Sequence, residues 1–80
     1  MFVPHSLTDF GDEILARYQS ADGRTLELGA NIMQDDAGDR YHWVVLDDDD
    51  NVVDSGTCPA RVTAVVSALQ SMDIFAAGQA

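Results

Sequence analysis

Basic side chains are scarce in this 80-residue sequence, which has no lysine and only four arginines against 14 aspartates and glutamates. The formal net charge is -10 at pH 7. Contact with phosphates takes clustered lysine and arginine, whereas Arg17, Arg24, Arg40 and Arg61 are spread along the chain. We therefore expect no direct binding to nucleic acid and none to an anionic membrane surface.

Cysteine is equally scarce, because Cys58 is the only one and cannot form an internal disulfide. No C-x-x-C pair or His/Cys cluster indicates structural zinc. An apolar core must therefore hold the fold together, either alone or shared across a dimer interface. The hydrophobic fraction of 46% is sufficient for such a core, and we expect residues 1–80 to form one small acidic domain.

Long hydrophobic runs are also missing. No apolar stretch approaches the roughly 20 residues that a transmembrane helix needs. The first five residues have neither the basic region nor the apolar core of a secretory signal peptide. A cytoplasmic location is the resulting expectation.

Several segments have the composition of antiparallel strands. In the clearest of them, Leu26, Leu28, Ala30 and Ile32 alternate with polar residues, which predicts one buried face. A second is aromatic and β-branched and includes Trp43. Strands are expected at residues 24–33, 41–46 and 52–55, the last ending at Gly56, with turns at residues 34–39 and 47–51.

The C-terminal region predicts an amphipathic helix that begins at Pro59 and ends near Asp73. Its apolar stripe at helical spacing consists of Val62, Val65, Val66, Leu69 and Met72, widened by Ala64 and Ala68. We expect this stripe to dock on a sheet face lined by Leu26, Leu28, Ile32, Trp43 and Val45.

The first third of the chain has two interpretations. Residues 13–20 followed by a turn read as a hairpin strand, but Leu7, Phe10 and Ile14 also fit a helical stripe. Ser6 with Asp9 resembles a helix capping box, whereas Gly11 disfavours a helix interior. We favour a short helical turn at residues 6–10 and then a strand.

The fold class is accordingly α+β. It is an antiparallel meander of four strands with a C-terminal helix packed on one face, or of three strands if the first segment is helical.

Two motifs are incomplete matches to known functional sites. Asp47, Asp49 and Asn51 match the opening of a calcium-binding loop, but Val52 and Cys58 stand where that loop requires Gly and Glu. Cys58 and His42 resemble a nucleophile and a base, yet no third residue orients them. We therefore expect no metal, no cofactor and no catalytic activity.

The acidic residues of the predicted turns and strands are instead candidates for partner binding. Alternate residues of a strand lie about 6.6 Å apart, which is comparable with phosphate spacing along nucleic acid. A rigid acidic surface can thus occupy a cationic channel built for DNA or RNA. The candidates are Glu27, Asp35, Asp36, Asp39, Asp47, Asp48, Asp49, Asp50 and Asp54.

In size, charge and lack of a catalytic motif, the whole chain resembles the small phage-encoded acidic inhibitors, the anti-CRISPR and anti-restriction proteins, several of which act as nucleic-acid mimics. The resemblance implies a non-catalytic inhibitor in the host cytoplasm. Its partner would be a cationic surface of a CRISPR effector or another DNA-binding complex. The alternative is a structural or interaction domain from a GC-rich or salt-adapted cell, acidic for solubility, that forms a homodimer through the free face of its sheet.

Overall fold

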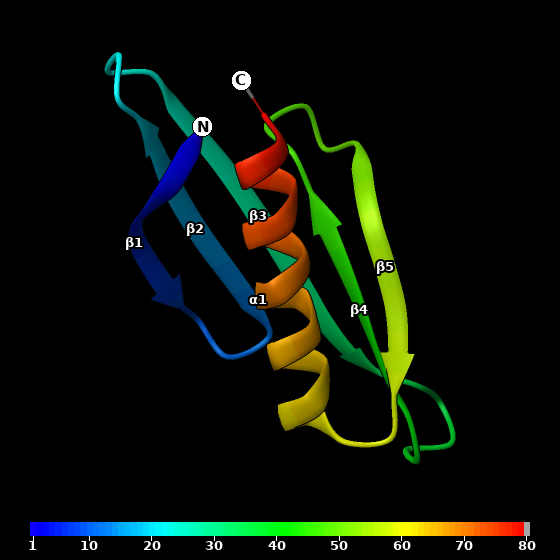
Figure 1. Cartoon of the computed structure of the whole chain (residues 1–80). Coiled ribbons are helices and arrows are strands. Elements are labelled where there is room, and N and C mark those ends of the chain that lie inside the picture. The colour runs from blue at the N-terminus through cyan, green and yellow to red at the C-terminus, as the bar shows by residue number, and fades with distance from the viewer. Residues whose placement is uncertain (80) are drawn as a thin grey trace.

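Five strands form one antiparallel sheet in the order of the sequence, and one helix covers one face of it (Figure 1). The computed structural model describes residues 1–79. The elements are β1 (Phe2–Asp9), β2 (Glu13–Ser20), β3 (Thr25–Gln34), β4 (Tyr41–Leu46), β5 (Val52–Cys58) and α1 (Arg61–Gly78). The α+β meander with a C-terminal helix is confirmed, with five strands rather than four.

The additional strand is β1, so the helical turn predicted at residues 6–10 is wrong. β1 pairs with β2 from Phe2 opposite Ser20 to Asp9 opposite Ile14. The carboxylate of Asp9 accepts a hydrogen bond from the backbone N–H of Gly11 at 2.7 Å, so it stabilises a hairpin turn rather than a helix. Gly11 has a φ of 89°, which glycine adopts at little cost.

The core lies between the sheet and α1, and the predicted sheet face lines it. Leu28, Ile32, Trp43 and Val45 are buried, and Leu26 is partly buried against them. The register places buried residues of β3 and β4 opposite each other: Ala30 lies opposite Val45, and Ile32 lies opposite Trp43. Alternation along the strands therefore identified the buried face correctly.

The last strand passes through Gly56 instead of ending there. Gly56 lies directly opposite Trp43, and the indole ring occupies the space where a side chain at position 56 would project. A Cβ atom built on Gly56 would be 2.7 Å from Cζ2 of Trp43. The glycine thus permits close packing inside β5 and does not terminate the strand.

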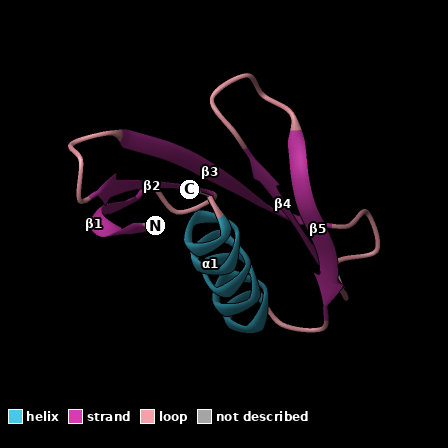
Figure 2. Cartoon of the chain, turned by 45° about the horizontal axis from the view of Figure 1, so that its top comes forward, coloured by secondary structure: helices cyan, strands magenta, loops and turns pink. Residues whose placement is uncertain are grey.

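The helix docks through the alanines and the methionine of the predicted stripe rather than through Val62 and Val66. Its buried side chains recur every four residues and are Ala64, Ala68, Met72 and Ala76. Val62 is 69% exposed and Val66 46% exposed, so their predicted burial is wrong, whereas Val65 and Leu69 pack partly against the core. Alanine lets the helix backbone approach the sheet, which curves around it in Figure 2. The buried face continues to Ala76, so α1 extends beyond Asp73, where it was predicted to end. The helix begins at Arg61 rather than at Pro59.

A hydrogen bond between the sheet and α1 fixes the helix further. The hydroxyl of Tyr18 in β2 donates to the carboxylate of Asp73 in α1 at 2.8 Å. Burial, followed by the hydrogen bond and the negative charge of Asp73, raises the pKa of Tyr18 well above its usual range. The neutral phenol is therefore the form that the folded state favours.

We predict from this contact that the protein loses stability in alkali. A folded-state pKa above the unfolded value gives stability that is complete below about pH 10 and falls as the pH rises beyond it. Urea unfolding measured between about pH 8 and 11 should show this fall. Tyr18→Phe should be less stable at neutral pH but should have a flatter alkaline slope. An equally steep slope in Tyr18→Phe would show that another group causes the loss.

Candidate functional site

The turns of the meander alternate between its two ends, and the acidic residues follow them (Figure 1). The β3–β4 turn carries Asp35, Asp36 and Asp39, while the β4–β5 turn carries Asp47–Asp50 at the opposite end. The nine candidate acids therefore do not form one continuous patch.

Four of the candidates do gather, on the sheet face that points away from α1. A shallow hollow of about 470 Å³ lies there, which we call the outer hollow. Its apolar part comes from Leu15, Gly29 and Leu46, which the register places side by side across β2, β3 and β4. The acidic residues that line it are Glu13, Glu27, Asp47, Asp48 and Asp50.

The outer hollow forms because β3 is longer than β4. Gly29, in the middle of β3, lies opposite Leu46, the last residue of β4. The aspartates after Leu46 therefore lie beside the part of β3 that precedes Gly29, which includes Glu27. On the other side of β3, Arg17 of β2 lies opposite Glu27. Gly29 has no side chain to fill the space between Leu15 and Leu46, which leaves the surface hollow.

The β4–β5 turn holds its aspartates by hydrogen bonds to the backbone. The carboxylate of Asp47 accepts from the N–H groups of Asp49 and Asn51, both at 2.9 Å. Asp50 has a φ of 61°, a left-handed conformation that Asp and Asn tolerate better than most residues. Asp47 thus shapes the turn, while Asp48 and Asp50 are exposed at the outer hollow.

The charge of the outer hollow is strongly negative because one arginine faces five acids. Arg17 contacts Glu27 at 3.0 Å, and both side chains are more than half exposed. Such an exposed pair contributes little to stability. It leaves the four other carboxylates lining the hollow outside that ion pair.

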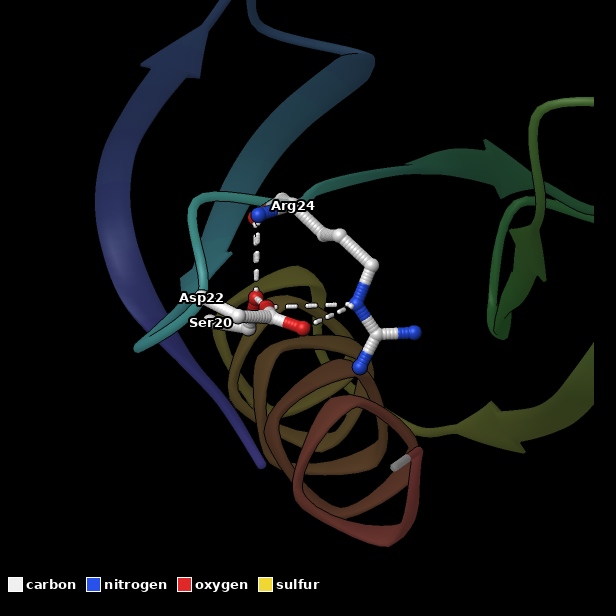
Figure 3. Close-up of polar contacts among 3 residues, drawn as sticks. All are labelled: Ser20, Asp22 and Arg24. Carbon is white, nitrogen blue, oxygen red and sulfur yellow. Dashed lines mark hydrogen bonds and ion pairs between the residues drawn. The ribbon is translucent and has the colours of Figure 1, made fainter.

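The remaining arginines are mostly engaged elsewhere. Figure 3 shows Arg24 in contact with Asp22, at 3.0 Å, in the β2–β3 turn. Hydrogen bonds from Ser20 and Arg24 lower the pKa of Asp22 to about 2. Arg61 donates to the backbone carbonyl of Gly11 and ties the start of α1 to the β1–β2 turn. These contacts keep both arginines away from the outer hollow.

The other candidate acids have separate surroundings. Asp54 faces α1, where its carboxylate accepts a hydrogen bond from Ser71 at 2.5 Å. Asp35 caps its own turn by accepting from the N–H of Gly38 at 2.8 Å. Asp36, Asp39 and Asp49 are exposed, and none of them lines the outer hollow. Sequence reasoning missed Glu13, Leu15 and Leu46; the signal for Leu15 was its alternation in β2 with Ile14 and Ala16, which are buried on the other face.

The residues with possible chemistry are not brought together. Cys58 lies opposite Tyr41 and His42 opposite Thr57, so the thiol and the imidazole project from opposite faces of the sheet. Cys58 is buried, with its sulfur 3.7 Å from the hydroxyl oxygen of Ser67. Among residues 1–79, no group of three or more His, Cys, Asp and Glu side chains has a geometry that could hold a metal ion.

Two further findings concern the chain as a whole. Within residues 1–79, no helix has both the length and the apolar character needed to span a membrane. Comparison with protein-family models, with curated proteins and with solved structures finds no match to this chain.

Proposed function

We propose that this chain is a non-catalytic inhibitor that uses the outer hollow to bind a cationic surface of a nucleic-acid-handling protein complex, such as a CRISPR effector. The observation that supports this most is the gathering of Glu27, Asp47, Asp48 and Asp50 around one hollow with a single arginine among them. The site of action we propose is the cytoplasm of a host cell. Inhibition would be stoichiometric, by occupation of the surface that nucleic acid needs.

The chemistry of the hollow favours a protein over a metal ion or a small ligand. Its carboxylates are exposed and spread around a shallow surface, whereas a hard cation requires six to eight oxygen ligands that converge. The apolar side chains of Leu15 and Leu46 lie among the acids. A partner that places arginine or lysine around an apolar side chain would match both features.

Removal of the aspartate charges at the outer hollow should weaken this binding. We predict that Asp47→Asn, Asp48→Asn and Asp50→Asn together leave the fold intact, because Asn can still accept the turn hydrogen bonds and tolerates the φ of residue 50. Complementary charge chiefly accelerates association, so the triple variant should associate at least about tenfold more slowly. Surface plasmon resonance on a panel of purified CRISPR effector complexes measures this rate, and competition with the complex's DNA checks the mechanism.

A control variant with the same change in net charge distinguishes an effect of the outer hollow from an effect of the protein's overall negative charge. Asp12→Asn, Asp36→Asn and Asp39→Asn also remove three negative charges, at the other end of the sheet. This control should retain most of the association rate, and parent binding should weaken with salt because the Debye length is only about 8 Å at physiological ionic strength. Equal losses in both triple variants would contradict a specific role for the outer hollow. Failure of the parent to bind any complex in the panel, or any restriction enzyme, would overturn the proposed function.

A further inference from the structure

The first part of β3 has a free edge on the side of β4. β4 pairs with β3 only from Gln34 to Gly29, because Leu46, opposite Gly29, is the last residue of β4. β3 begins earlier, at Thr25, and Figure 1 shows this part of it beyond the end of β4, next to the β2–β3 turn. Residues 25–28 are therefore paired with β2 on one side and with no strand on the other. We call this segment the open edge.

The register of the sheet identifies the backbone groups that the open edge presents. The N–H of Ser20 donates to the carbonyl oxygen of Arg24 at 2.9 Å, so these two residues form a hydrogen-bonded pair. Such pairs alternate along an antiparallel ladder, which makes Leu26 the next residue bonded to β2. Thr25 and Glu27 therefore direct their N–H and C=O groups away from β2, towards the open edge. Among residues 1–79, no backbone group pairs with these four groups.

The surroundings of the open edge are negatively charged. Glu27 and the aspartates of the β4–β5 turn line the outer hollow beside it. Arg17, the arginine of the hollow, is paired with Glu27. Arg24, which precedes the open edge, is paired with Asp22. α1 ends at the same end of the molecule, and its last turn, within the described chain, has no basic residue to compensate the partial negative charge of the helix C-terminus (Figure 1). Charge complementarity therefore favours a basic segment at the open edge.

We propose that an extended, basic segment of the partner protein pairs with the open edge and adds a strand in line with β4. This inference rests on the proposed function and names the element of the partner that the outer hollow receives. Hydrogen bonds to the backbone of Thr25 and Glu27 hold the segment. Side chains opposite these two residues project to the same face of the sheet, where arginine or lysine meets the aspartates.

The two outer strands of the sheet are less suitable for this pairing. In β1, Pro4 has no N–H group, and the pairing with β2 is irregular between Pro4 and Ser6. β5 lies at the opposite edge of the sheet, outside the outer hollow. A strand added to β5 would therefore not place its basic side chains against the acids of the hollow.

Proline substitution tests the pairing without changing the charge. Thr25→Pro removes an N–H group that the sheet does not use, at the first residue of β3, so the fold should be retained. The matched control is Thr57→Pro in β5. The N–H of Asp35 donates to the carbonyl oxygen of Arg40 at 2.9 Å, so His42, two residues further along, is bonded to β3. Thr57 lies opposite His42 and therefore directs its N–H towards the free edge of β5.

The two proline variants should differ in their affinity for an effector complex that binds the parent. We expect surface plasmon resonance to show a three- to tenfold loss, roughly one hydrogen bond, for Thr25→Pro and none for Thr57→Pro. Circular dichroism verifies the fold of each variant. Parental affinity of a folded Thr25→Pro, or equal losses in both variants, would overturn the open edge as the contact. A parent that binds no complex would overturn the proposed function, and the open edge is then tested with a peptide.

The peptide experiment needs no effector complex. The probe is a capped hexapeptide of alternating arginine and valine, added in excess to the full chain, with amide exchange measured by nuclear magnetic resonance. In the free protein, the amides of Thr25 and Glu27 should exchange faster than that of Leu26, which is bonded to β2. The peptide should slow exchange at Thr25 and Glu27 by at least about threefold. The same peptide N-methylated at each arginine keeps its charge but lacks the N–H groups that face the open edge, and it should give no protection. No protection by the unmodified peptide, or equal protection by both peptides, would overturn the proposal.

Discussion

Gly56→Val is expected to remove most of the protein's stability. The Cβ atom of any residue at position 56 would lie within 2.8 Å of three atoms of the Trp43 indole. The ring is rigid and belongs to the buried core. Overpacking of this kind costs about 1–3 kcal/mol, and more when a rigid ring must be displaced. A single core of this size supplies only about 3–5 kcal/mol of stability, so the substitution removes most of it.

Gly29→Val is the control for this experiment. It places the same side chain in the same sheet, but its Cβ atom would meet only Leu15 Cδ2 at 3.6 Å and the carbonyl oxygen of Ile14 at 3.8 Å, which are ordinary contacts. Valine also favours a strand more than glycine does. Chemical denaturation should therefore show Gly29→Val at least as stable as the parent. A Gly56→Val protein with parental stability would show that the indole does not occupy the position described.

Met72→Ala is expected to produce the second large loss. Met72 is fully buried and is the only large side chain among the four residues that α1 buries against the sheet. Its neighbours along the helix face are alanines, which cannot extend to fill the space that methionine leaves. Truncation of a buried methionine costs about 2–5 kcal/mol when the cavity persists. The free energy of unfolding in urea measures this cost.

Met33→Ala makes the same chemical change on the other face of the sheet. Met33 is 50% exposed, so little apolar area returns to water when it is shortened. We expect a loss below about 0.5 kcal/mol, typical of surface substitutions. If the two methionine variants had the same stability, α1 would not dock through the face that contains Met72.

Periodicity identified the buried face of the sheet but missed its first strand, and it identified only part of the buried face of the helix. In β3, apolar residues alternate with mostly polar ones, so only one face could be buried, and Leu28 and Ile32 were assigned correctly, as was Val45 in the aromatic and β-branched strand β4. In α1, the predicted stripe combined Ala64, Ala68 and Met72, which are buried, with Val62 and Val66, which are exposed. Close approach to a curved sheet favours the alanines over the larger valines, and this depends on tertiary packing that local hydrophobicity does not report.

The candidate site was only partly predictable for a related reason. Glu27 and the aspartates of the β4–β5 turn are identifiable as acidic from the sequence alone. Their meeting around the outer hollow depends on the register that puts Gly29 opposite Leu46, and on β3 extending beyond β4. Register is fixed by the turns and by packing across the sheet, so Asp54 could not be separated in advance from the aspartates that line the hollow.

The pairing of every strand with its neighbour in sequence has a consequence for how the chain folds. Each hairpin closes through a short turn, so the sheet can grow one strand at a time with little loss of chain entropy. The contacts that span the longest stretch of chain join α1 to the first strands, as between Tyr18 and Asp73. Because α1 follows all five strands, it emerges from the ribosome after them, and the apolar face of the nascent sheet remains exposed until the helix docks. Docking of α1 is thus the step that protects the folding chain from aggregation.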